Sequence, residues 1–252
     1  MLEALLSPDY DGDGKLANDF ASEIGRTVPL ESLKLLICSD NPETRASGAF
    51  ISTMMTRGRD LSFMIDELAQ LLDDPRERVR ADVIESISDW AAFKDSEILG
   101  RVMLHLDDES RLVRHIMIRV IQHSPSWMLQ LAIDNAAKLK PRSAFSDIKE
   151  MCNLYRHVLA ETILAMLNHS SATVRRFGIG LAAKPREIIF YRFLEEAEKS
   201  PDDEIKLQAA LLLRESSYEW HHGMPSNEVP EGAKRDRKEL RRLISEAVRG
   251  GG

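Results

Sequence analysis

The spacing of apolar residues along the chain predicts helices arranged in pairs. One run of apolar side chains at intervals of three and four comprises Leu61, Ile65, Leu68, Leu71 and Leu72. A second run, after a short polar break, comprises Val79, Val83, Ile84 and Ile87. Such spacing places the side chains on one face of an α-helix. The sequence therefore predicts two amphipathic helices that a short turn holds antiparallel.

This arrangement recurs along the chain. Each polar break contains Asp, Asn, Ser or Pro, which end one helix and cap the next, and a basic residue follows in the second helix. These basic residues are Arg45, Arg80, Arg114, Arg175 and Lys206, separated by 35, 34, 61 and 31 residues. The gap of 61 corresponds to roughly two periods. Because one helix pair cannot cover its own apolar faces, neighbouring pairs are expected to stack.

The second unit, Leu68-x-x-Leu71-Leu72-x-Asp74-x4-Val79-Arg80-x-Asp82-x-Ile84, resembles a repeat of the HEAT family. The resemblance covers residues 29–216 and implies an all-α fold, a right-handed α-solenoid of five to six HEAT-like helical hairpins. It also implies a structural ladder between adjacent repeats, in which acids of the turns face the basic residues. The acids that match are Asp40, Asp74 and Asp107, and the basic residues are Arg45, Arg80, Arg114, Arg175 and Lys206.

The two ends of the chain depart from the repeat. Residues 1–28 are predicted to form an N-terminal capping segment, whose amphipathic stretch 16–24 covers the first repeat. Residues 217–252 are predicted to form a loop followed by a charged C-terminal capping helix over 231–249. The beginning of the chain lacks the features of a signal peptide, and nowhere do eighteen apolar residues follow one another. The predicted location is the cytoplasm.

Composition and charge narrow the classes of partner. The chain has 252 residues, of which 43% are hydrophobic, and its 41 acids against 34 bases give a net charge of −7. This balance argues against nucleic acid as the main partner. Residues 60–110 hold fourteen acids and five bases, a local charge of −9 that would repel phosphate. Cys38 and Cys152 have no CxxC spacing, so we expect two buried, reduced thiols.

Two short motifs resemble parts of metal-binding sites, but neither motif is complete. Asp9, Asp11 and Asp13 with Gly14 match the beginning of a calcium loop, but its twelfth position, which needs a carboxylate, is Phe20. The segment 220–222, Trp-His-His, has no third ligand at a fixed spacing. We therefore expect no calcium, no other metal and no cofactor.

No catalytic motif is present, and the chain is not expected to be an enzyme. Nucleophile elbows and phosphate-binding glycine loops are absent. Iron-dependent hydroxylases of HEAT type use His-Glu pairs, and no His here is followed by Glu. The enzymatic alternative is a HEAT-like DNA glycosylase or a cofactor lyase. The basic run 234–242 could contact nucleic acid or acidic lipid, although its apolar stripe favours a capping helix.

The second helices supply the candidate site. Counted from each basic residue, the outward positions predicted for three repeats are Ser47, Phe50 and Met54, then Asp82, Glu85 and Asp89, then Ile116, Arg119 and His123. Apolar anchors beside carboxylates are what a protein-binding patch needs. The predicted partner-binding residues are Phe50, Met54, Asp82, Glu85, Asp89, Trp90, Arg119 and His123.

The sequence thus favours a non-enzymatic protein-binding repeat scaffold that binds a partner protein through its concave, acidic face. The narrower hypothesis is a bacterial immunity protein or antitoxin, which blocks a cognate basic toxin, because opposite electric fields speed the encounter. A generic assembly or adaptor scaffold is the alternative.

Overall fold

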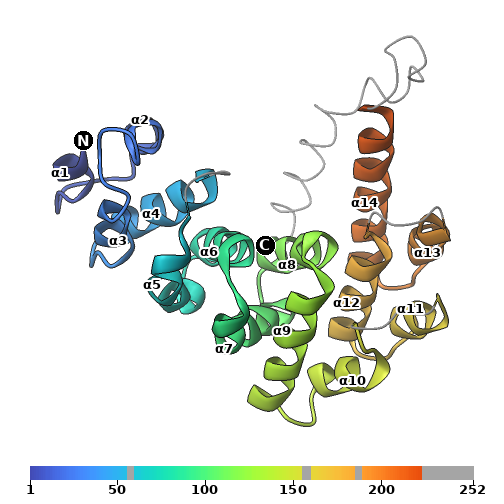
Figure 1. Cartoon of the computed structure of the whole chain (residues 1–252). Coiled ribbons are helices and arrows are strands. Elements are labelled where there is room, and N and C mark those ends of the chain that lie inside the picture. Colours follow the sequence, from blue (N-terminus) through green and yellow to red (C-terminus); the bar gives the residue numbers. More distant parts are fainter. Residues whose placement is uncertain (56–59, 155–159, 185–188, 223–252) are drawn as a thin grey trace. The chain divides into compact units, whose positions relative to one another are not determined.

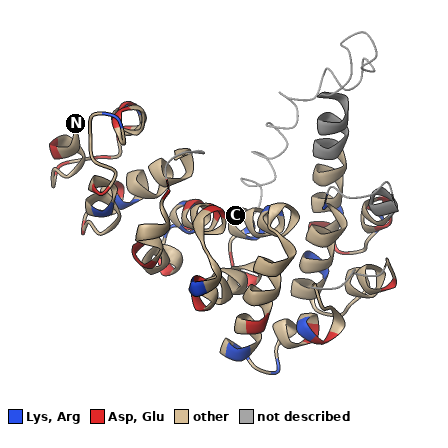
Figure 2. Ribbon diagram, in the orientation of Figure 1, with Lys and Arg blue, Asp and Glu red and all other residues tan. Residues whose placement is uncertain are grey.

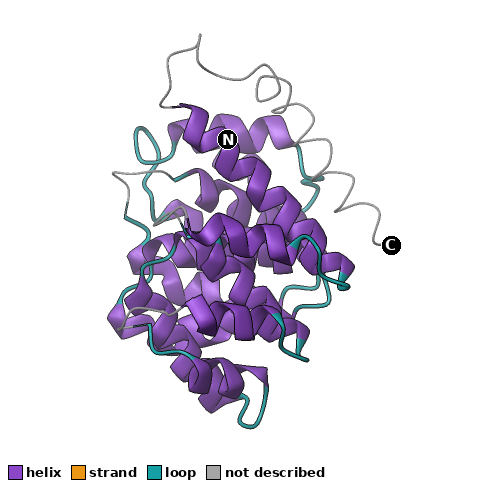
Figure 3. Ribbon diagram, turned by 90° about the vertical axis from the view of Figure 1, so that its right-hand side faces the viewer, coloured by secondary structure: helices purple, strands orange, loops and turns teal. Residues whose placement is uncertain are grey.

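The computed structural model describes residues 1–55, 60–154, 160–184 and 189–222. Within these ranges all regular structure is helical, as predicted, apart from one isolated bridge between Ile24 and Val28 (Figure 3). An N-terminal segment contains α1 (Leu2–Leu5) and α2 (Gly14–Glu23).

Helix pairs follow this segment in chain order (Figure 1). They are α3 (Ser32–Ile37) and α4 (Pro42–Met54), α5 (Ile65–Gln70) and α6 (Glu77–Trp90), α7 (Ser96–Leu104) and α8 (Arg111–His123), α9 (Ser126–Leu139) and α10 (Ala144–Met151), α11 (Ala160–Leu167) and α12 (Ala172–Ala182), and α13 (Ile189–Ala197) and α14 (Asp203–His222). Short 3-10 helices precede α5 and α7, namely η1 (Ser62–Met64) and η3 (Phe93–Asp95), and others follow them, namely η2 (Leu71–Asp73) and η4 (His105–Asp107).

The turn within each pair is built in the same way. A side chain in the turn accepts a hydrogen bond from the backbone N–H two residues later, which satisfies one of the free amides at the start of the second helix. The accepting residues are Ser39, Asp74, Asp108, Ser143, His169 and Asp202. Ser143 is the N-cap of α10, and the pair formed by α9 and α10 fills part of the 61-residue gap.

The chain divides into two compact units. Unit 1 consists of residues 1–117 and 127–139, and unit 2 of residues 118–126 with the described residues from 140 onward. In unit 1, α3 packs against α4 and α5, and α6 packs against α4 and α5. In unit 2, α11 packs against α12 and α13, and α14 packs against α12 and α13. Inside each unit, first helices thus lie beside first helices and second helices beside second helices.

The predicted apolar positions form the core of unit 1. Leu68, Leu72, Val83, Ile84 and Ile87 are all fully buried. Burying an aliphatic side chain of this size contributes about 1.5–3 kcal/mol each to folding. The repeat pattern is therefore the pattern of the core, and it fixes which face of each helix remains for other roles.

The N-terminal segment packs on the first helix pair through α2 and α4. The Tyr10 hydroxyl lies 2.8 Å from Ser47 Oγ, and Thr44 Oγ1 donates to the carbonyl of Leu5. Phe20 and Ile24 are fully buried beneath this contact.

The end of the repeat region differs from the prediction at one point. Residues 217–222 were expected to be a loop, but they continue α14 as far as His222. The segment 220–222 is thus helical. The predicted capping helix over 231–249 lies outside the described residues.

Candidate functional site

Of the outward positions predicted on α4 and α6, the second and third on each helix are exposed or half-buried. On α4, Met54 is 44% exposed and Phe50 is half-buried. On α6, Glu85 and Asp89 are exposed and Trp90 is half-buried. The acidic residues of α5 and α6 are marked in red in Figure 2.

These residues lie on two neighbouring helices. The two helices pack against each other, and Ser52 Oγ lies 2.7 Å from Ser86 Oγ across their contact. We call the surface formed by Phe50, Met54, Glu85 and Asp89 the α4/α6 face. It combines apolar area that a partner can desolvate with carboxylates that can select the partner's charge.

Arg119 and His123 on α8 are also exposed. Both belong to unit 2, whereas the α4/α6 face belongs to unit 1. Arg119 and His123 are therefore not part of the α4/α6 face.

The prediction that Asp82 points outward is wrong. Asp82 is only 5% exposed, and Ser47, which occupies the same position on α4, is 7% exposed. Ser47 faces the N-terminal segment, as its contact with Tyr10 shows. Burial raises the pKa of the Asp82 carboxyl to about 6, although its ion pair with Arg78, at 3.1 Å, acts in the opposite direction.

We expect Asp82→Asn to stabilise the protein at pH 7. The unfolded carboxyl loses its proton near pH 3.8 and the folded one near pH 6, so the folded state binds more protons between these values and stability falls as pH rises through them. D82N removes that fall and gains about 3 kcal/mol at pH 7. Urea unfolding at pH 4.5 and pH 7 measures the difference from wild type. Asp19→Asn, at an exposed acid of α2, is the control and is expected to leave both values unchanged.

The turns carry an arginine ladder between successive helix pairs. The side chains of three arginines reach the capping acid of the next turn: Arg45 with Asp74, Arg80 with Asp108, and Arg175 with Asp202. Each arginine also donates from Nη1 to two backbone carbonyls of its own turn, five and six residues earlier. Arg114 makes the same two carbonyl contacts.

Three positions of the predicted ladder need correction. The acid of the third turn is Asp108 and not Asp107, because Asp108 caps α8 and is held by Arg80 at 2.8 Å, while Asp107 is exposed. Asp40 contributes its backbone carbonyl to Arg45 and not its carboxylate. In the last turn Asp202 pairs with Arg175, and Lys206 is exposed.

The ladder explains the ionisation of its acids. Burial opposes the charge on Asp108, but hydrogen bonds from Arg80, His105 and the Ser110 N–H outweigh it and lower the pKa. The pKa of Asp202 is lowered in the same way, with Arg175 as the main donor. These ion pairs join adjacent helix pairs.

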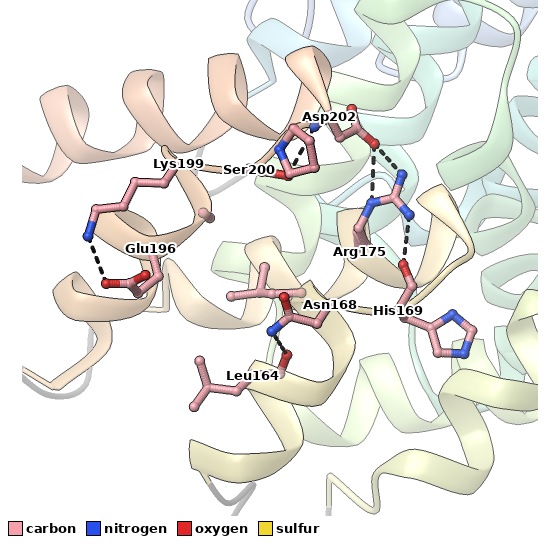
Figure 4. Close-up of a pocket in the computed structure, with 11 residues that line it drawn as sticks. Leu164, Asn168, His169, Arg175, Glu196, Lys199, Ser200 and Asp202 are labelled. Atoms are coloured by element: carbon pink, nitrogen blue, oxygen red, sulfur yellow. Dashed lines mark hydrogen bonds and ion pairs between the residues drawn. The ribbon is translucent and has the colours of Figure 1, made fainter.

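Unit 2 contains a hollow of about 670 Å³ between the turn of α11 and α12 and the turn of α13 and α14 (Figure 4). Arg175 and Asp202 of the ladder line it, and Lys199 is paired with Glu196 at 2.8 Å. Asn168 donates to the carbonyl of Leu164. The charged groups of the hollow are thus engaged with one another, and the hollow is a groove between repeats.

The residues of the calcium-like segment have structural roles. The Asp13 carboxylate accepts from the Lys15 N–H and caps α2, and Phe20, at the twelfth position, lies in the core. No group of three His, Cys, Asp or Glu side chains suited to a metal ion occurs in the part of the chain that the structure describes. Among the same residues, none of the helices combines the length and the apolar character that crossing a membrane requires.

The comparisons with known proteins give no assignment: neither a model of a known protein family nor a curated protein matches this sequence.

Aromatic residues at or just before the starts of the first helices were not predicted as part of a site. Phe63, Phe93 and Trp127 occupy these positions in unit 1, about one repeat apart. Their spacing is visible in the sequence, but aromatic residues at the start of a helix are ordinarily taken as core. Phe63 and Phe93 are instead exposed, at 40% and 61%.

Proposed function

We propose that this protein is a non-enzymatic helical-repeat scaffold that binds another protein through its α4/α6 face. The helix pairs stack as HEAT-like hairpins of a right-handed α-solenoid, and the second helices form its inner, binding surface. The partner presents a basic surface to Glu85 and Asp89 and an apolar patch to Phe50 and Met54.

The stacking part of the proposal is supported by the repeated geometry of the turns. The same capping contact and the same carbonyl contacts of arginine recur along the chain, in both units. An arginine that joins one turn to the next sets a constant step between helix pairs, and a constant step generates a solenoid.

The binding part is carried by one observation. Met54 is a large apolar side chain that is 44% exposed, on a helix packed directly against one that bears two exposed carboxylates. Burying Met54 and Phe50 in an interface supplies affinity, and the carboxylates supply selectivity and a faster encounter.

Within this proposal the most specific partner class is a basic toxin that the protein blocks, as a bacterial immunity protein does. The negative charge of residues 60–110 supports it, because acidic inhibitors associate quickly with basic enzymes. Co-expression with the candidate toxin tests this class. Cells that survive only with this protein support it, and cells killed regardless contradict it.

The face itself is tested with Glu85→Lys combined with Asp89→Lys. Partners captured by the immobilised wild-type protein are identified by mass spectrometry, purified and titrated against both forms. We expect the double variant to lose at least a hundredfold in affinity, since two attractive contacts become repulsive. The melting temperature should move little, because exposed charges contribute little stability.

The matched control is Glu150→Lys with Glu161→Lys, which makes the same charge change at exposed positions of α10 and α11. It is expected to retain binding. A partner that binds the face variant and the control variant equally well shows that the α4/α6 face is not the contact.

A further inference from the structure

The first-helix side of unit 1 contains a cation bound by an aromatic ring and a carboxylate. Lys34 Nζ, from α3, lies 5.3 Å from the centroid of the Phe63 ring and 2.5 Å from Glu67 Oε1. Phe63 and Glu67 are four residues apart, in η1 and at the start of the next first helix, α5. An aromatic ring and a carboxylate at this spacing can therefore bind a cation together, the ring through its face and the carboxylate through an ion pair.

The next helix pair has an aromatic ring and a carboxylate at the same spacing, but no lysine at the position that corresponds to Lys34. Phe93, in η3, and Glu97, at the start of α7, are again four residues apart, and both are exposed. Lys34 lies five residues before the capping Ser39, and the corresponding residue before Asp74 is Ala69. Among the described side chains, no ion pair joins Glu97 to a base, not even to the neighbouring Lys94.

Trp127 holds the Phe93 ring in a fixed orientation, which favours contact with a cation. The two rings are stacked, with centroids 4.4 Å apart and planes inclined by 14°. Although one face of Phe93 lies on Trp127, the residue is still 61% exposed, so its other face and edge are open to solvent. Stacking fixes the ring, which lowers the entropy cost of binding a ligand to it.

We propose that Phe93, Trp127 and Glu97 form a binding site for an arginine side chain of a protein partner. A guanidinium is planar and weakly hydrated, so it stacks on an aromatic face and pairs with a carboxylate in one geometry. Asp66 is a further exposed carboxylate on α5, and the local excess of acids suits a basic segment. The site lies on first helices and is independent of the α4/α6 face.

The test titrates the full-length protein with a capped peptide of alternating Arg and Gly. The indole N–H signal of Trp127, assigned by its loss in Trp127→Phe, is followed by nuclear magnetic resonance. We expect a saturable shift of this signal with a dissociation constant in the millimolar range, and weaker binding of the lysine peptide. The citrulline peptide keeps the shape of arginine without its charge, and it should produce no shift.

Two variants examine the site. Phe93→Leu keeps an apolar side chain but removes the aromatic ring, and it is expected to weaken peptide binding about fivefold. Glu97→Gln should weaken it by a similar factor and remove most of its salt dependence. The matched control Phe63→Leu leaves the peptide affinity unchanged, because Lys34 already covers that ring.

A gain of binding provides an independent check. Lys34→Ala exposes the Phe63 and Glu67 pair, so the arginine peptide is expected to bind at a second site and to shift the backbone amide of Glu67. No second site in this variant would show that the two pairs are not equivalent and would overturn the proposal.

Other results would also overturn it. A shift of Trp90 without one of Trp127 would place the peptide on the α4/α6 side, and equal shifts from the citrulline peptide would remove the role of charge. Unchanged affinity in Phe93→Leu would remove the role of the ring. Glu85→Lys with Asp89→Lys is expected to retain peptide binding, so failure here and failure of the proposed function are distinguished.

Discussion

Arg80→Met is expected to lower the free energy of unfolding by about 4 kcal/mol. Arg80 is 7% exposed, and its guanidinium donates to the carbonyls of Asp74 and Pro75 and to both carboxylate oxygens of Asp108. Methionine fills a similar volume but leaves the Asp108 carboxylate, which is largely buried, without its main cation. Urea unfolding at pH 7 measures the loss.

The matched control is Arg101→Met. Arg101 also makes an ion pair, with Asp73, but its side chain is 39% exposed and that of Asp73 is 80% exposed. Exposed pairs contribute about 1 kcal/mol or less. Equal losses in the two variants would show that the ladder contact at Arg80 has no special weight.

The pH dependence provides a second measure of the same contact. Because the pKa of Asp108 is lowered in the folded state, its contribution to stability is present at neutral pH and is lost as pH falls through the folded pKa. We expect this acid-dependent loss in the wild type and a smaller one in Arg80→Met, where the lowered pKa returns toward its usual range.

Gly100→Val is expected to cost about 3 kcal/mol of stability. Gly100 lies on α7 where that helix meets α9, and a Cβ atom there would lie 2.6 Å from Asn135 Cβ and 3.1 Å from the Asn135 backbone carbon. The clash is with backbone, so rotation of one side chain cannot relieve it. The two helices have to move apart, which weakens apolar contacts on both. Thermal and urea unfolding measure the effect.

Gly14→Val is the control for this substitution. A Cβ atom at Gly14, the first residue of α2, meets nothing within 4 Å. The variant is expected to unfold within about 0.5 kcal/mol of wild type. A Gly100→Val protein that is equally stable would show that α7 and α9 are not held in close contact.

The sequence predicted the helix pairs because the core follows the helical period, and residues such as Leu68 and Ile84 are fully buried as expected. It placed Glu85 and Asp89 correctly at the surface and Asp82 wrongly. All three are acids on one helix at intervals of three and four, so the pattern does not distinguish them. The difference arises from tertiary packing, which buries Asp82 and leaves the other two acids exposed.

The ladder is a second case in which the sequence pattern does not identify the residue that makes the contact. Asp107 and Asp108 are adjacent acids in one turn, and either fits the repeat pattern. The structure selects Asp108, because the residue that caps α8 must place its carboxylate beside the Ser110 N–H, and Arg80 then reaches that carboxylate. The repeat pattern locates the acid of a turn only to within one residue. A hydrogen bond requires a donor–acceptor distance within a few tenths of an ångström, so its geometry selects one of the two carboxylates.

By itself the sequence determined the helical class, the pairing of helices, the approximate period and the excess of negative charge, since these depend on residue types and their order. The tertiary structure decided which acid caps each turn, which carboxylate is buried, and that Phe93 and Trp127 stack. Those properties depend on distances between residues far apart in the chain, and only packing sets such distances.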